Sequence, residues 1–153
     1  MHQIRTHAAR PRRRAGTVPT LALVALLALS AALASTALAR SSKTVVGEAR
    51  APSLHATVLT STKGLTLYSL SIEKNGHFAC TGSCTSIWHP LLVPAGTTPK
   101  GPVKLGTVKR PEGKKTQVTY KGLPLYTFNG DSAKGQANGQ GIKDVGTWHA
   151  AMP

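Results

Sequence analysis

Two cysteines and the histidines near them are the residues of this chain whose types and spacing most suggest chemistry. Cys80 and Cys84 enclose three residues, and His77 and His89 lie close to them in sequence. Thiolates combined with imidazoles suit copper(I) or zinc, which allows an extracytoplasmic copper-binding or redox protein. Disulfide formation would abolish that coordination. The other interpretation is therefore a structural disulfide between the two cysteines, with no cofactor.

The remaining histidines and the carboxylates supply no recognisable catalytic group. His55 and His149 reach a metal site only if the fold brings them near the cysteines, and the cysteine spacing excludes covalent haem attachment. No nucleophile-elbow pattern is present, and no two carboxylates can be assigned to one sugar bond. We therefore expect a non-enzymatic protein, and the third class considered is a weak hydrolase using Asp131 and one histidine.

A glycine-rich loop over residues 130–141 is the other segment with chemical potential. Its backbone N–H groups could cradle an anion, but it lacks the Gly-Lys-Ser/Thr sequence of a phosphate-binding loop. We expect a structural loop in which Asp131 accepts backbone N–H bonds and fixes the turn after Phe128.

The first 39 residues have the three parts of a secretory signal peptide. Five arginines within the first fourteen residues precede the uncharged run Leu21 to Ala39, which ends in Ala37-Leu38-Ala39. Small residues at 37 and 39 predict cleavage after Ala39 and a secreted or extracytoplasmic protein that meets the membrane only during export. The alternative is an uncleaved membrane anchor, since a helix rising about 1.5 Å per residue would cross the hydrocarbon core over this length. In an oxidising compartment, two thiols so close in sequence most simply form a disulfide.

The charge of the chain indicates the class of partner. There are 19 Lys and Arg residues against 5 Asp and Glu, a formal +14, and removing the five leader arginines leaves +9. The lysines are denser between Lys100 and Lys121. They are interpreted first as a solubilising surface and second as attraction to anionic cell-envelope polymers or to another envelope protein. No motif for groove reading is present, so specific nucleic-acid binding is not expected. The oligomeric state is not fixed by the sequence.

The elements that must position these residues are short strands. Residues 40–53 mix Ser, Lys, Gly, Ala and Pro and are predicted to be a flexible linker, with the domain over 54–153. Strands are expected at 55–61, 65–70, 103–108, 116–120, 123–128 and 147–151, separated by pairs such as Asn75-Gly76 and Lys121-Gly122. One short helical turn is expected after the cysteines, from Thr85 to Trp88. This pattern predicts an all-β fold, a small antiparallel domain that is sandwich- or barrel-like.

The chain contains an internal repeat. Residues 64–70, Gly-Leu-Thr-Leu-Tyr-Ser-Leu, match residues 122–128, Gly-Leu-Pro-Leu-Tyr-Thr-Phe, and each copy is followed by a Trp-His pair. Two tandem copies of one supersecondary unit, about 54–100 and 101–153, explain this similarity. Leucines on one face and Tyr68 or Tyr126 on the other predict central strands covered on both sides. Tyr68, Tyr126, Trp88 and Trp148 are expected in the core, and sugar or ligand stacking is the alternative.

At these residues the chain resembles the bacterial secreted-repeat family known as predicted lipoproteins with a Tyr-x-aromatic-x-x-Asp motif. The second copy carries that motif as Tyr126, Phe128 and Asp131, and Trp148 matches the closing tryptophan of the family. In the first copy, Cys80-Thr81-Gly82-Ser83-Cys84 followed by Trp88 resembles the family's Cys-x-Gly-x-Cys and Trp-Pro-Pro-Leu segments.

The first copy departs from the family pattern at three places. Tyr68 is followed by Leu70 where an aromatic residue is usual, Glu73 stands near the place of the aspartate, and His89 replaces a proline. The lipid-acceptor cysteine is also missing, which suggests a freely secreted form. The resemblance implies a secreted location and an unassigned biochemical role. The expected function is therefore a secreted or envelope-associated binding or structural module.

Overall fold

The computed structural model describes residues 41–153, so the expected signal peptide and its cleavage point lie outside the described residues. These residues form short strands and two short 3-10 helices, and none of their helices could span a membrane. The strands are β1 (Ser42–Thr44), β2 (Val46–Ala51), β3 (Ala56–Ser61), β4 (Leu67–Leu70), β5 (Trp88–Pro90), β6 (Leu92–Val93), β7 (Thr98–Lys100), β8 (Leu105–Lys109), β9 (Thr116–Tyr120), β10 (Leu123–Pro124), β11 (Tyr126–Phe128) and β12 (Trp148–Ala150); the helices are η1 (Pro52–Leu54) and η2 (Gly82–Ser86).

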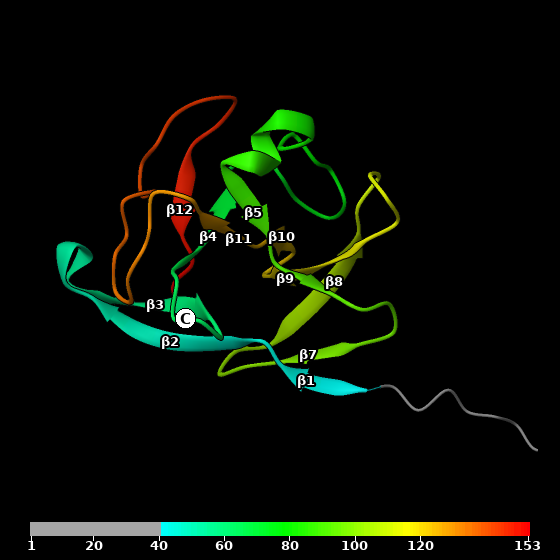
Figure 1. The fold of residues 1–153 in the computed structure, drawn as a ribbon, viewed down its shortest axis with the longest axis horizontal. Coiled ribbons are helices and arrows are strands. Elements are labelled where there is room, and N and C mark those ends of the chain that lie inside the picture. The colour runs from blue at the N-terminus through cyan, green and yellow to red at the C-terminus, as the bar shows by residue number, and fades with distance from the viewer. Residues whose placement is uncertain (1–40) are drawn as a thin grey trace, which may run out of the picture. The chain divides into compact units, whose positions relative to one another are not determined.

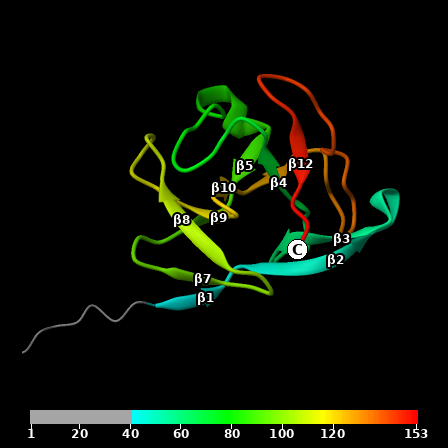
Figure 2. The ribbon, with the colours of Figure 1, turned by 180° about the vertical axis from the view of Figure 1, so that it is seen from behind.

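The strands form several small sheets, most of them antiparallel (Figures 1 and 2). One four-stranded sheet has the order β12-β4-β11-β5, and a second joins β10, β9 and β6 with β8 on the other side of β9. The pair β2-β3 is antiparallel, whereas β1 and β7 are parallel. The predicted all-β antiparallel class is confirmed, and the described residues form no closed barrel.

The amino-terminal part of the domain differs from the expected linker over 40–53. Residues 42–44 and 46–51 form β1 and β2, and β2 pairs with β3 along its whole length. β2 forms a strand because Val46, Ala49 and Ala51 are buried. The sequence did not indicate this strand because these few small apolar residues are interspersed with polar residues, glycine and proline. The folded domain therefore begins near Ser42, about a dozen residues before the expected boundary at Leu54.

Two further expectations shift in position. The predicted strand 123–128 is two strands, because the chain passes at Leu125 from the sheet containing β9 to the sheet containing β4. The predicted helical turn at 85–88 is η2, which begins between the cysteines, and Trp88 already belongs to β5. The turn at Lys121-Gly122 forms as expected: both residues have positive φ, 51° and 79°, which suits the two-residue connection between β9 and β10.

The two sequence copies interlock around a pseudo-twofold axis between β4 and β11. Tyr68 lies opposite Tyr126 at this axis. Each copy's closing strand pairs with the other copy's central strand: β5 of the first copy lies on β11, and β12 of the second copy lies on β4. Equivalent backbone hydrogen bonds join the residue after each closing strand to the other copy: Leu91 N–H donates to Leu125 O at 2.9 Å, and Ala151 N–H donates to Leu67 O at 2.8 Å. The copies are thus consecutive in sequence but intertwined in space.

Two hydrophobic clusters lie on opposite faces of β4 and β11. Tyr68 and Tyr126 belong to one cluster, whereas Leu67 and Leu125 belong to the other. Both strands have a neighbour on each side. This arrangement confirms that the two repeated segments are central strands covered on both faces.

Candidate functional site

The aromatic residues of the repeated motif meet at the centre of the first cluster. Trp88 and Trp148 stack with ring centroids 3.8 Å apart and an interplanar angle of 8°. Each tryptophan meets its own copy's tyrosine edge to face, Tyr68 with Trp88 at 5.5 Å and Tyr126 with Trp148 at 5.2 Å. All four are at most 2% exposed. They are core residues, as expected, and their rings are not open to a stacking ligand.

The motif tyrosines bond the carboxylates of the opposite copy. Tyr68 donates to Asp131 Oδ2 at 2.6 Å, and Tyr126 donates to Glu73 Oε2 at 2.9 Å. Asp131 Oδ1 accepts from Asn138 N–H, and Glu73 Oε1 accepts from the N–H groups of Ala79 and Cys80. Asp131 thus accepts one backbone N–H bond within its loop, from Asn138 rather than from the turn after Phe128, and the aspartate also joins the two copies.

The environment of both tyrosines favours the neutral phenol. Burial raises the pKa of Tyr68, and its bond to Asp131 raises it further. Burial also raises the pKa of Tyr126, as does the negative charge of Glu73, against a smaller lowering by Arg110. Each hydroxyl therefore keeps its proton and donates a hydrogen bond to a buried carboxylate.

Arg110 extends the Tyr126 side of this network toward the surface. Its guanidinium donates to Gln117 Oε1 at 2.6 Å, to the Tyr126 oxygen at 3.0 Å, and to the Cys80 carbonyl at 2.7 Å. It also pairs with Glu112 at 2.9 Å. Burial opposes the charged form, but the bonds to Glu112 and Tyr126 leave the pKa of Arg110 raised and that of Glu112 lowered. Tyr126 thus links buried Glu73 to a nearly buried cation.

The cysteine segment is attached to the same network. Cys80 and Cys84 form a disulfide, and η2 lies within and just after their short loop. Gly82 N–H donates to Glu112 Oε1 at 2.8 Å, and Arg110 holds the Cys80 carbonyl. The disulfide therefore shapes a turn that packs against the loop following β8.

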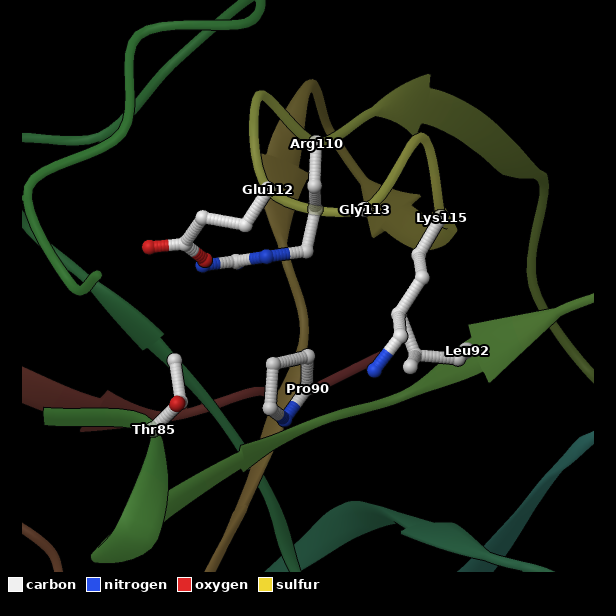
Figure 3. Close-up of a pocket in the computed structure, with 7 residues that line it drawn as sticks. All are labelled: Thr85, Pro90, Leu92, Arg110, Glu112, Gly113 and Lys115. Carbon is white, nitrogen blue, oxygen red and sulfur yellow. The ribbon is translucent and has the colours of Figure 1, made fainter. Parts of the chain in front are cut away.

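A surface hollow of about 270 Å³ lies where these parts meet (Figure 3). Arg110 and Glu112 lie side by side on one wall, and Lys115 reaches toward Pro90 and Leu92. Arg110 already donates to four oxygen atoms, one of them on Glu112, so these two charges are matched within the protein and Lys115 supplies the remaining charge of the hollow.

The structure does not assemble the sequence-predicted metal candidates. His55, His77, His89 and His149 are all exposed, and no group of three or more His, Cys, Asp or Glu residues within 41–153 is arranged to hold a metal ion. The disulfide occupies both sulfurs. No observation on this structure favours the copper or redox alternative.

Several backbone N–H groups of the glycine-rich loop already donate to side chains of the protein. Gln136 Oε1 accepts from the N–H groups of Ser132 and Ala133, and Gly139 N–H donates to the Tyr68 oxygen. Gly139 also lies against the aromatic centre, where a Cβ would be 2.8 Å from Trp88 Cη2. The N–H groups considered for anion binding therefore serve the loop and the core.

The lysines are densest on one hairpin, which holds five of the eleven lysines within residues 41–153. We use the name basic hairpin for residues 104–121, which include β8, β9 and their connecting loop. It carries six basic residues and a single acidic one: Lys104, Lys109, Arg110, Lys114, Lys115 and Lys121, with Glu112. Each of its five lysines is exposed. The corresponding residues of the first copy, 46–63, carry only Arg50, Lys63 and Glu48 as charged residues. Three hollows border the basic hairpin: the one in Figure 3 and two of about 500 and 570 Å³.

Sequence reasoning did not identify Arg110 or Gln117 as parts of the interior. Arg110 is 4% exposed and Gln117 is fully buried, yet in sequence both stand among lysines and threonines. The only available signal was that Arg110 is the single arginine in a stretch of lysines, and an arginine suits several simultaneous bonds to oxygen better than a lysine does.

Comparison with known proteins gives a match for the second copy. Residues 106–152 match the sequence model of a family described as a secreted repeat of unknown function. This match confirms the suspected secreted-repeat resemblance and runs from the second residue of β8 to beyond the end of β12. No curated protein and no solved structure matches the chain.

Proposed function

From the secreted-repeat match and the charge of the second copy, we propose that this chain is a non-enzymatic module that works outside the cytoplasm and binds an anionic polymer of the cell envelope. The arginine-rich leader and the secreted character of the matched family support the location. Cleavage after Ala39 would release the domain, because the lipid-acceptor cysteine of the family is missing.

The carrying observation is the charge difference between two hairpins that share one fold. The pseudo-twofold imposes similar cores on both copies, so a structural requirement would place similar residues on both hairpins. The central strands agree in their buried leucines and tyrosines, but the exposed charge of the hairpins does not agree. The basic hairpin has five exposed lysines, whereas residues 46–63 have one exposed arginine, one exposed lysine and one exposed glutamate. A requirement of solubility would not concentrate the lysines on one hairpin.

The expected mechanism is multivalent attraction with release of counterions. Glu112, the acidic residue of the basic hairpin, is already paired with Arg110, so it cancels little of the positive potential of the five lysines. Each lysine that meets a polymer charge releases about one condensed counterion, which makes the affinity fall with salt concentration. No bond is made or broken in the ligand.

The test is calorimetric titration of the exported protein with polyphosphate at several salt concentrations. A variant with Lys109→Gln, Lys114→Gln and Lys115→Gln should lose about two to three units of the slope of log affinity against log salt. A control with Lys43→Gln, Lys63→Gln and Lys143→Gln removes the same charge elsewhere and should keep the slope. Equal losses in the two variants would show that net charge alone attracts the polymer, and absence of binding by the unaltered protein would refute the proposal.

A further inference from the structure

The three hollows beside the basic hairpin differ in what they can accept. The hollow of Figure 3 contains Lys115 beside the Arg110–Glu112 pair, but the arginine already donates to four oxygen atoms of the protein, and no aromatic ring lines the hollow. The 500 Å³ hollow has Lys109 but is otherwise lined by small residues and aliphatic groups without an aromatic ring. The 570 Å³ hollow, which we call the Tyr120 hollow, is lined by an aromatic residue and two lysines together: Lys104, Gly106, Thr119, Tyr120 and Lys121 are among its lining residues.

Tyr120 is held firmly but remains partly exposed. It ends β9, where it lies opposite Leu105 of β8 and Leu123 of β10. One side of the residue packs against the second hydrophobic cluster. Its hydroxyl has no hydrogen-bond partner among residues 41–153, unlike those of Tyr68 and Tyr126. A positioned ring whose hydroxyl has no partner within the protein is suited to a ligand that has both an apolar face and polar groups.

The surroundings of the ring add charge and space. Lys121 Nζ lies over the Tyr120 ring, 4.6 Å from its centroid, and Lys104 lines the same hollow. Gly106 forms part of the wall, and a Cβ there would be 2.8 Å from Thr119 Oγ1. The absence of a side chain at 106 therefore leaves room beside the threonine hydroxyl.

The first copy lacks this ring at the corresponding place. Thr62-Lys63-Gly64-Leu65 aligns with Tyr120-Lys121-Gly122-Leu123, so the lysine and the glycine are shared by both turns whereas the aromatic residue is not. The turn itself does not require tyrosine.

We propose that the Tyr120 hollow is a subsite for one anionic sugar unit, so that the polymer bound by the basic hairpin is an acidic polysaccharide of the uronic acid type. The apolar C–H face of the sugar lies on the Tyr120 ring, and its carboxylate is bound by Lys104 and Lys121. Lys121 leaves the ring face when it pairs with the carboxylate, because an exposed cation–π contact is weak and the ammonium gains a charged partner. This inference rests on the proposed function and specifies its ligand.

The experiment compares three probes on the exported protein by calorimetric titration: an oligogalacturonate, polyphosphate of equal total charge, and neutral dextran. Tyr120→Leu removes the ring while keeping an apolar side chain against the second cluster. It should weaken oligogalacturonate binding by about tenfold or more and change polyphosphate binding by less than about twofold. Lys121→Gln should weaken oligogalacturonate binding, whereas the matched Lys63→Gln in the first copy should not. Circular dichroism melting checks that each variant is folded.

The outcomes separate this inference from the proposed function. Binding of neither polyanion by the unaltered protein refutes both. Binding of polyphosphate without oligogalacturonate, or equal effects of Tyr120→Leu on both polyanions, refutes the sugar subsite and leaves the polyanion function standing. Dextran binding as tight as that of oligogalacturonate would refute the anionic character of the sugar.

Discussion

The crossed tyrosine–carboxylate bonds predict which side chains are energetically coupled. Each tyrosine stands five residues before the carboxylate of its own copy but bonds the carboxylate of the other. A double-mutant cycle of Tyr126→Phe with Glu73→Gln should therefore give a coupling energy of about 1–2 kcal/mol. The cycle of Tyr126→Phe with Asp131→Asn should give about 0.5 kcal/mol or less, since those two side chains share no bond.

The sizes of the single effects follow from burial and from the partners that are lost. Tyr68, Tyr126 and Glu73 are fully buried and Asp131 is 5% exposed, so water cannot replace a missing hydroxyl at low cost. Tyr68→Phe leaves Asp131 Oδ2 without its donor and should cost about 2 kcal/mol in free energy of unfolding. Tyr126→Phe removes bonds to both Glu73 and Arg110 and should cost more, about 3 kcal/mol.

Urea unfolding followed by tryptophan fluorescence measures these energies, because Trp88 and Trp148 stack in the core beside both tyrosines. The reciprocal cycles, Tyr68→Phe with Asp131→Asn and with Glu73→Gln, provide the matched comparison. Coupling that is larger within a copy than between copies would refute the crossed arrangement, and with it the interlocked description of the two repeats.

Three further predictions concern the same core. The pKa values of Tyr68 and Tyr126 are raised in the folded state, so the unfolded chain releases these protons at a lower pH than the folded protein does. The stability that the two protonated tyrosines contribute is therefore complete below pH 10 and is lost as pH rises above 10, by about 1.4 kcal/mol per pH unit for each tyrosine. In a Tyr120→Phe background, tyrosinate absorbance should appear together with unfolding, and tyrosinate absorbance in the folded protein near pH 10 would contradict the prediction. Reduction of the Cys80–Cys84 disulfide should lower the free energy of unfolding by only about 2 kcal/mol, because the closed loop is short. Thermal melting followed by circular dichroism, with and without reductant, should show that the β signal is retained before the melt. Complete unfolding on reduction would contradict this prediction. Gly139→Ala should destabilise by about 1–3 kcal/mol, since its Cβ would meet Trp88 and Tyr68 at 2.8 and 3.0 Å, whereas Gly47→Ala, with 3.3 Å to a threonine hydroxyl, should cost less in the same thermal assay.

The parts of the fold that could be predicted from the sequence are those with a repeated local pattern. The segments around Tyr68 and Tyr126 alternate in type and are flanked by glycine turns, so their strand character, central position and two-sided burial followed from the pattern. β2 could not be predicted in this way, because three small apolar residues separated by Gly, Glu and Arg carry little hydrophobic signal until β3 pairs with them.

The site depends on contacts that a linear motif does not contain. The sequence indicated that Tyr126 and Asp131 belong together, since they share one motif, but their bonds run to the other copy through strand exchange. Glu73 appeared to be an imperfect version of the aspartate. Its longer side chain instead reaches two backbone N–H groups and Tyr126 at the same time. Such long-range pairings are set by topology and cannot be inferred from spacing alone.

The interlocked arrangement also explains where the two copies are free to differ. A change at Tyr68, Trp88, Tyr126 or Trp148 disturbs both halves at once, because each of these side chains lies against the other copy or its central strand. The strands β2 and β3 pair with each other, and β9 pairs with β8 on one side and with β6 and β10 on the other. The exposed side chains of these hairpins point away from the centre and can change without altering it. Lysines and a partly exposed tyrosine could therefore accumulate on the basic hairpin while residues 46–63 kept only two cations and one carboxylate. A symmetric core with one altered hairpin provides a rigid support for a single binding surface, which is the physical reason that we assign recognition to the second copy.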